Sequence, residues 1–352
     1  IQESGLLTNE LDKYNIKYHF LPVIKLHKKM FSPNYLIRLL IDTFQSLKKL
    51  RKIIKEDNVE IIYSNTLTVM LGVLYSFFYK TKHIWHCHEI MYSPKLFVTI
   101  YRKILGSKSI DKVIFNSKAT LDCWVNNSDI INKKAELVYN GIDLNVSLET
   151  DENVAKLRNS LFPSLNEDSL IYGNIGRISD RKGIEILIDA FQVIHQEYPN
   201  SYLLLVGSPT PGKEDFLHQM EAKIKQYQLI NHIKFVPFVH NVFPYWQSMD
   251  IAIIPSKEPE PFGLVAIEAM LVKRPVIVAN HGGLTEIVDN NVTGIKFQPN
   301  NLTELVNAMR ELTKNSEKRI LYGNNGHNVV LEKFNVNRYV ENIATICKNL
   351  IS

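Results

Sequence analysis

The chain has 352 residues and a formal net charge of +5 at pH 7, with 45% hydrophobic and 22% charged residues, which suits a globular protein with room for two domains. No apolar run approaches the ~20 residues that span a bilayer, and no secretory signal peptide is visible. The three cysteines (Cys87, Cys123 and Cys347) are too scattered for a disulfide framework or a zinc site, so we expect a cytoplasmic protein.

The first part of the chain is basic and amphipathic. Nine Lys and Arg residues lie between Lys25 and Glu56, against Asp42 and Glu56, and Tyr101-Arg102-Lys103 and Lys108 extend this character. This pattern fits a solvated helix face and, equally well, a surface that contacts anionic lipid at the inner face of a membrane. No nucleic-acid motif accompanies the charge. The interleaved apolar residues are Phe31, Tyr35, Leu36, Leu39, Leu40 and Phe44.

Strand-like and helical segments alternate along residues 1–148, which predicts βαβ units and a parallel sheet. Residues 149–168 are polar and patternless and are predicted to be a linker. The alternation restarts over residues 169–332. We therefore predict two Rossmann-like, doubly wound α/β lobes that face each other across a cleft, with ligands at the carboxyl ends of the strands. The expected strands are 59–63, 83–87, 112–115, 134–138, 170–173, 202–206, 233–235, 251–254 and 275–278.

The most informative segment runs from Glu260 to Glu268. It follows a buried strand-like run, 251–254, and the helix predicted to begin at Gly263 would offer the backbone N–H groups of Gly263 and Leu264 to an anion. The carboxylate of Glu260 precedes these amides and that of Glu268 follows them, and both can accept hydrogen bonds from hydroxyls. Two glutamates on a solvated helix face are the ordinary alternative, which the apolar residues between them disfavour. A diphosphate, a ribose and a hexose would fit this arrangement.

A glycine-containing turn opens the second lobe after its first strand. Gly176 lets the backbone approach a ligand, while Arg177 and Lys182 can bind phosphate oxygens. The segment is neither a Walker A loop nor a GxGxxG motif. A purely structural strand-to-helix turn is an equal alternative for this segment considered by itself.

Other strand ends carry weaker signals. Gly282 and Gly283 precede Glu286, either as an ordinary turn or as a wall of the cleft beside a bound sugar. In the first lobe, we expect His86 and His88 to point to opposite faces of a strand, with His86 in the core and His88 facing the cleft. Asn140 belongs to an Asn-Gly turn at another strand end.

Together these residues resemble the retaining glycosyltransferases of family four, which have the two-lobed GT-B fold and share the E-x7-E pattern of Glu260 and Glu268. The resemblance implies that Arg177 and Lys182 hold the donor diphosphate, that Glu260 contacts the donor sugar, and that Glu268 contacts the ribose. It also implies that His88 lies near the reacting carbon and that residues 333–352 cross back to the first lobe. The remaining expected donor or cleft residues are Gly176, Phe238, Val239, Phe262, Gly263, Leu264, Asn140, Gly282, Gly283 and Glu286.

The resemblance thus predicts a hexosyltransferase that retains anomeric configuration in polysaccharide or glycolipid synthesis. We expect a UDP- or GDP-linked sugar as co-substrate, a glycan or lipid-linked acceptor, and no metal or further cofactor. Such enzymes usually open with a βα unit, which we expect to be missing before Ile1, and its loss would reduce activity. A nucleotide-sugar epimerase and a non-catalytic nucleotide-sugar-binding module are the alternatives.

Overall fold

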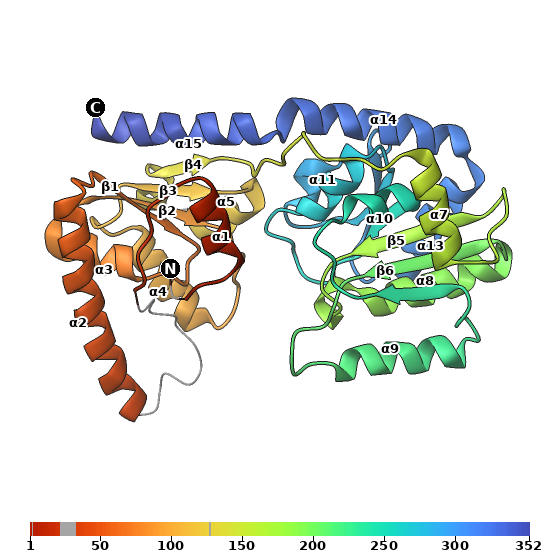
Figure 1. Ribbon diagram of the computed structural model, residues 1–352, viewed down its shortest axis with the longest axis horizontal. Helices are drawn as coiled ribbons and strands as arrows, with labels where there is room; N and C mark the ends of the chain where they lie inside the picture. Colours follow the sequence, from red (N-terminus) through yellow and green to blue (C-terminus); the bar gives the residue numbers. More distant parts are fainter. Residues whose placement is uncertain (2, 22–32, 127) are drawn as a thin grey trace. The chain divides into compact units, whose positions relative to one another are not determined.

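The computed structural model describes residues 1, 3–21, 33–126 and 128–352, and the chain divides into two compact units (Figure 1). The first unit contains Ile1–Val138 and Asn342–Ser352, and the second contains Tyr139–Glu341. Helix α15 (Val336–Ile351) begins in the second unit, and its later residues belong to the first.

The first unit is built on a four-stranded parallel sheet of order β1-β2-β3-β4. Strand β2 is buried except at Lys82, and Trp85, Phe115 and Trp124 fill the core beside the sheet. Burial on both faces explains why the two central strands are mostly apolar in the sequence. The strands are β1 (Ile61–Asn65), β2 (Lys82–Cys87), β3 (Lys112–Phe115) and β4 (Ala135–Leu137), and the helices are α1 (Leu6–Lys13), α2 (Pro33–Glu56), α3 (Leu71–Tyr79), α4 (Lys95–Leu105), α5 (Lys118–Val125) and α6 (Asp129–Asn132).

The second unit holds a six-stranded parallel sheet of order β10-β9-β8-β5-β6-β7. Its strands are β5 (Leu170–Ile175), β6 (Ser201–Val206), β7 (Ile233–Val236), β8 (Ile251–Ile254), β9 (Val276–Ala279) and β10 (Gly294–Phe297). Its helices are α7 (Asp151–Leu161), α8 (Ile184–Glu197), α9 (Asp215–Gln226), α10 (Phe243–Ser248), α11 (Leu264–Leu271), α12 (Leu284–Ile287), α13 (Leu302–Lys314) and α14 (Ser316–Lys333), with the 3-10 turn η2 (Asp180–Lys182) before α8.

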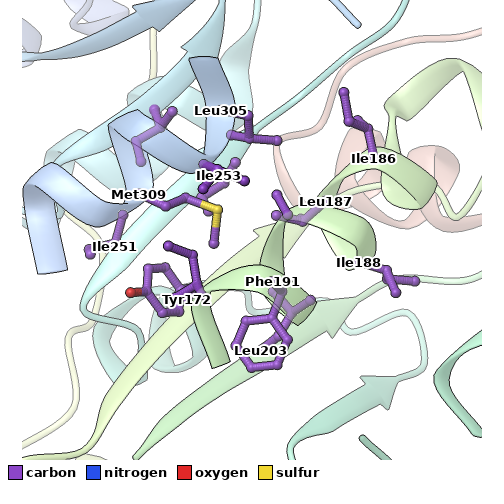
Figure 2. Packing of buried hydrophobic residues seen from close by; sticks show 14 of the residues in the cluster. Tyr172, Ile186, Leu187, Ile188, Phe191, Leu203, Ile251, Ile253, Leu305 and Met309 are labelled. Atoms are coloured by element: carbon purple, nitrogen blue, oxygen red, sulfur yellow. The ribbon is translucent and has the colours of Figure 1, made fainter. Parts of the chain in front are cut away.

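Alternate residues of each strand enter two separate cores, as the pleat of a strand requires. Tyr172 and Ile251 pack with Phe191 of α8 and Met309 of α13 on one face (Figure 2). Ile171 and the other strand residues whose side chains point to the opposite face of the sheet pack with α10, α11 and α14. Helices on both faces make this sheet doubly wound, as the sequence predicted.

The connectivity creates one switch point in the second sheet. The chain runs from β5 outward to β6 and β7, then returns to place β8 on the other side of β5 and continues to β9 and β10. The loops that follow β5 and β8 therefore leave the sheet in opposite directions. A crevice at the carboxyl ends of these two strands is where open α/β sheets bind ligands.

Several segments differ from the sequence predictions. Residues 149–168, expected as a linker, contain α7, which is fixed to the second unit because Arg158 pairs with Asp250 at 3.1 Å and Leu161 and Phe162 are buried. Strand β10 was not predicted, since Gly294-Ile-Lys-Phe is short and contains a lysine. Helices α10 and α14 were also missed.

The amphipathic stripe is only partly described. Lys25, Lys28, Lys29 and Phe31 lie outside the described residues, as do the side chains of residues 33–40. Farther along α2, Ile41 and Phe44 are 52% and 72% exposed. Among the helices that the structure describes, none combines the length and apolar character that crossing a bilayer demands.

Candidate donor-binding site

The loops after β5 and β8 are in close contact at the switch point. Gly183 ends the turn η2 with φ 69°, and a Cβ built there would lie 1.9 Å from the carbonyl oxygen of Pro255. Only glycine fits both this backbone conformation and this contact. The turn after β5 is thereby held against the segment that carries Glu260.

Lys182 and Glu260 form the polar centre of this contact. The Lys182 Nζ donates to Glu260 Oε1 at 2.5 Å, and the hydroxyl of Ser256 donates to the same oxygen at 2.5 Å. The Glu260 side chain is 13% exposed and that of Lys182 is 33% exposed. The carboxylate therefore has a fixed orientation with one oxygen occupied, while the cation keeps access to solvent.

Gly282 and Gly283 form a wall against the backbone of this acidic segment. Gly282 has φ 59°, and a Cβ there would lie 2.4 Å from the carbonyl oxygen of Glu260. The Gly283 N–H donates to that oxygen at 2.7 Å, and a Cβ on Gly283 would lie 2.5 Å from the carbonyl oxygen of Phe262. The two glycines are needed because backbone lies directly against backbone.

Helix α11 begins beside the same segment. Gly263 precedes it with φ 116°, and the helix starts at Leu264, which is 42% exposed. A helix leaves its first N–H groups without intrahelical partners, and the dipole adds positive potential there. This end of α11 favours an anion, whereas Phe262 is buried in the core.

Two pockets meet at Arg177. The first has a volume of about 380 Å³, and Lys182, Glu260 and Pro261 line it. The second has a volume of about 540 Å³ and is largely apolar. Arg177 lines both pockets and is exposed, and it forms no ion pair or hydrogen bond within the described part of the chain. The residues lining the larger pocket are Ile175, Gly176, Arg177, Val206, Gly207, Ser208, Pro209, Thr210, Pro211, Phe238, Val239, Val242, Val265 and Glu268.

Glu268 places a carboxylate on the wall of the larger pocket. Its Oε2 accepts a hydrogen bond from the indole Nε1 of the buried Trp246 at 3.1 Å. Burial raises the pKa of the Glu268 carboxyl, and the Trp246 hydrogen bond opposes that shift. The carboxylate thus lies among apolar side chains, oriented by one donor.

Phe238 and Val239 follow β7 and line the same pocket. The Phe238 N–H donates to Ser208 Oγ at 2.9 Å, and its ring is 66% exposed. The loops after β6 and β7 are thereby tied together at the pocket. A planar ring system could pack between the exposed Phe238 and the apolar wall.

Glu286 and Asn140 are not among the residues that line these two pockets. Tyr139 donates to Glu286 Oε2 at 3.0 Å, and its ring stacks on Phe262 with the centroids 6.1 Å apart. Burial raises the pKa of Tyr139 to about 12, with the charge of Glu286 adding to it. Asn140 precedes Gly141, which lies against the backbone of Asn335.

The first unit has a separate cluster of polar residues at the carboxyl ends of β1, β2 and β3. His88 Nε2 lies 2.5 Å from Asn65 Oδ1, and its Nδ1 lies 3.4 Å from the buried Asn116. His86 is 1% exposed, and burial lowers its pKa to about 3. His86 therefore belongs to the core as predicted.

The predicted orientation of these two histidines was wrong. The rings of His86 and His88 lie side by side with their centroids 3.9 Å apart. Residues two positions apart on a strand share a face, so the two rings point the same way. Two side chains point to opposite faces of a strand only when an odd number of positions separates them.

Two family models match the chain, one in each half. Residues 12–146 match "Glycosyltransferase Family 4" and residues 158–329 match "Glycosyl transferases group 1". The structure also superposes on a crystal structure of Anabaena Alr3699/HepE in complex with UDP and glucose, with a TM-score of 0.82 and 23% identity over 98% of this chain and 90% of that one. The chain has the GT-B fold of glycosyltransferases.

Curated relatives are similar to this GT-B chain over part of their length. An uncharacterized glycosyltransferase of Methanocaldococcus jannaschii is 30% identical over 61% of this chain and 54% of its own. Alpha-1,3/1,6-mannosyltransferase ALG2 of Dictyostelium discoideum is 25% identical over 79% of this chain and 72% of its own. The match thus spans about half of the first relative and nearly three quarters of the second.

Three supporting residues of this GT-B chain were not anticipated from the sequence. Ser256 holds Glu260, Trp246 holds Glu268 and Tyr139 holds Glu286. The segment 208–211 at the end of β6 also lines the larger pocket. This loop could have been predicted from the sequence, because it directly follows a predicted strand and ligands bind at the carboxyl ends of such strands. No sequence signal marks Trp246, since only the packing of α10 on α11 brings it to Glu268.

Proposed function

We propose that this protein transfers a sugar from a nucleotide-sugar donor to an acceptor hydroxyl with retention of anomeric configuration. The observation that carries the proposal is the pair of pockets sharing Arg177 at the switch point of the second sheet. The apolar pocket suits a nucleoside, and the polar pocket with Lys182 and Glu260 suits a diphosphate and its sugar. The two compartments match the two chemically different halves of a nucleotide-sugar.

In this proposal, cationic groups stabilise the departing diphosphate. Arg177 and Lys182 bind its oxygens, and the start of α11 adds the positive potential of unpaired N–H groups. Such fixed donors act where negative charge develops, which is usually the largest contribution to catalysis of this kind. Release of Lys182 from Glu260 would accompany donor binding.

The remaining predicted residues contact the rest of the donor. Glu260 accepts hydrogen bonds from sugar hydroxyls, and Glu268 accepts them from the ribose. We assign Phe238 and Val239 to the base, and His88 to the reaction at the anomeric carbon. We assign Gly282, Gly283 and Glu286 to the wall of the site beside the sugar. Asn140 is adjacent in the chain to Tyr139, which donates a hydrogen bond to Glu286.

The transfer step proceeds without a covalent enzyme intermediate. The bond between the anomeric carbon and the diphosphate oxygen breaks, and the acceptor oxygen bonds to that carbon on the same face. The acceptor proton passes to the leaving phosphate. No residue of the chain acts as a nucleophile in this scheme, and no metal ion or further cofactor is assigned a role.

The names of similar proteins support a hexosyl donor. The relatives include a mannosyltransferase and a mannosylfructose-phosphate synthase, and the Anabaena structures contain UDP or UDP-glucose. We therefore propose a UDP- or GDP-linked hexose as donor. As acceptor we propose a glycan or a lipid-linked glycan at the cytoplasmic face of a membrane, in surface polysaccharide or glycolipid synthesis.

A panel of nucleoside diphosphates in a thermal-shift assay on the full chain tests the donor site, because a ligand that binds the folded state raises the apparent Tm. UDP or GDP should raise it and ADP should not. NMR of the anomeric proton, with donor and a glycan acceptor, should then show a retained linkage. Conversion of the donor without acceptor would identify an epimerase, and binding without any turnover would identify a binding module. Failure of every diphosphate to bind would refute the proposal.

A further inference from the structure

Another polar pocket lies at the amino-terminal ends of the strands in the first unit's sheet, opposite the cluster that contains His88. It has a volume of about 640 Å³ and is lined at the start of β2 by Lys82 and just before β3 by Asp111. His88 and Asn116 follow the carboxyl ends of the same two strands. The pocket therefore faces the amino-terminal edge of the sheet and is separate from that polar cluster.

The pocket carries an excess of positive charge. Lys80, Lys82 and Lys108 line it together with a single acid, Asp111. Lys82 lies 3.7 Å from Asp111, whose Oδ2 also accepts from the backbone N–H of His83 at 2.9 Å. Neither Lys80 nor Lys108 forms an ion pair with a residue in the described part of the chain. Three cations facing one carboxylate favour an anionic ligand.

Two hydroxyl groups in the same pocket lack partners. Ser76 is 4% exposed and lines the pocket, yet its Oγ makes no hydrogen bond. The Oγ of Ser107, on the facing segment, is buried and equally unpartnered. Both hydroxyl oxygens are shielded from solvent, so the polar groups that the pocket offers to a ligand are those of its lysines and Asp111.

A pair of exposed aromatic rings borders this pocket. Phe77, which lines it, is 67% exposed, and the adjacent Phe78 is 62% exposed. Their rings contact each other edge to face, with centroids 5.3 Å apart, at the end of α3. Two large apolar side chains beside several lysines are typical of a surface that enters the interface of an anionic bilayer.

We propose that this surface docks on a bilayer containing anionic phospholipid. The lysines surround a headgroup phosphate, and Phe77 and Phe78 enter the interface beside it. The cationic character of the surface disfavours a second copy of the same chain, since the two positive faces would repel. The inference deepens the proposed function, because it places the protein where a lipid-linked acceptor is found.

Co-sedimentation of the full chain with vesicles tests this directly. Vesicles of phosphatidylcholine with about 30 mol% phosphatidylglycerol should bind the protein, and pure phosphatidylcholine should bind it far less. The triple variant K80Q/K82Q/K108Q should lose about 100-fold in affinity, at roughly fivefold for each lysine near the surface. The variant F77A/F78A should also bind more weakly while keeping its sensitivity to salt.

A further variant separates docking from general charge. The triple variant K225Q/K314Q/K333Q, which changes three exposed lysines of the second unit, should bind as the wild type does.

The proposal is overturned if the wild type ignores anionic vesicles or if K80Q/K82Q/K108Q binds them unchanged. It is also overturned if the exposed rings prove to hold a dimer, seen as a molecular mass by light scattering that F77A/F78A halves. Vesicle binding needs neither donor nor turnover, so its failure would leave the proposed sugar transfer standing.

Discussion

Lys182 and Glu260 are separated by 78 positions in the sequence, yet Lys182 Nζ lies 2.5 Å from Glu260 Oε1. The loops after β5 and β8 bring them together at the switch point of the second sheet. Because the ion pair occupies one oxygen of Glu260, a donor must compete with Glu260 for the lysine. Binding and catalysis can therefore be separated by changing one partner at a time.

Lys182→Gln should weaken binding of the nucleoside diphosphate and reduce kcat/KM for transfer by about 100- to 1,000-fold, the range found when one donor to developing negative charge is lost. Calorimetry with UDP or GDP and initial-rate kinetics measure the two effects. Lys225→Gln, on the exposed face of α9, is the matched control and should change neither. Normal turnover by a variant lacking both Arg177 and Lys182 would contradict the assignment.

Glu260→Gln should behave in the opposite way toward the diphosphate. The amide no longer competes for Lys182 as a charged partner, so UDP or GDP should bind as tightly as to the wild type or more tightly. Sugar transfer should nevertheless fall, because the carboxylate is assigned to the sugar. A parallel loss of diphosphate binding would show that Glu260 supports the fold of the pocket instead.

The pH dependence of donor binding should identify Glu268. Burial raises the pKa of this carboxyl, so protonation begins at higher pH than for an ordinary glutamate, and affinity should fall as the pH decreases through that raised value. Glu268→Gln should lack this fall. The titration of the ligand itself affects both proteins alike, so the difference between their affinity profiles isolates Glu268.

Trp246→Phe should move the same fall in affinity to higher pH. The indole hydrogen bond favours the charged carboxylate, and its loss leaves the effect of burial unopposed. Affinity at pH 8 should be closer to that of the wild type than affinity at pH 6. An identical profile in the wild type and the variant would show that the indole does not act through Glu268.

Gly282→Ala should destabilise the second unit and abolish transfer. The new Cβ would lie 2.4 Å from the carbonyl oxygen of Glu260, and φ is 59°. Gly212→Ala is the matched control, since Gly212 also has a positive φ (78°) but has no atom within 4 Å of the new Cβ. It should cost about 1 kcal/mol, and Gly282→Ala clearly more. Equal Tm losses would refute the steric argument.

Acid should destabilise the first unit through His83. Burial lowers the pKa of His83 from 6.5 to about 4, so the unfolded chain binds the proton first. Stability is therefore full above pH 6.5 and declines as the pH falls toward 4, by about 3 kcal/mol for this group. Native-state hydrogen exchange of β2, corrected for the intrinsic rate at each pH, measures the decline.

His83→Gln should reduce the slope of that decline whatever its effect on stability at pH 7. The comparison uses the change in opening free energy between pH 7 and 4.5, so a constant cost of the substitution cancels. His218→Gln on the exposed part of α9 should leave the slope unchanged. An equal slope in wild type and His83→Gln would assign the acid sensitivity to other groups, of which the buried His86 is the first to test.

The sequence predicted the strands best where they are buried on both faces. Strands β3 and β8 were predicted with their observed bounds, because continuous apolar runs mark them. Strand β10 was missed, and so were α10 and α14, whose apolar residues find their partners only in the folded chain. Helix α7 was predicted to be a linker because it has no long apolar face. It is attached to the second unit by Arg158, Leu161 and Phe162.

The amino-acid sequence by itself determined the alternation of strands and helices and the identity of the charged residues that follow the strands. Local chemistry suffices for these, since apolar periodicity and glycine spacing are properties of short segments. Only the tertiary structure decided that Lys182 meets Glu260, that Trp246 orients Glu268, and that one arginine borders two pockets. Those relationships depend on the order of strands in the sheet, which brings distant segments within hydrogen-bonding distance and leaves no trace in the spacing of residues along the chain.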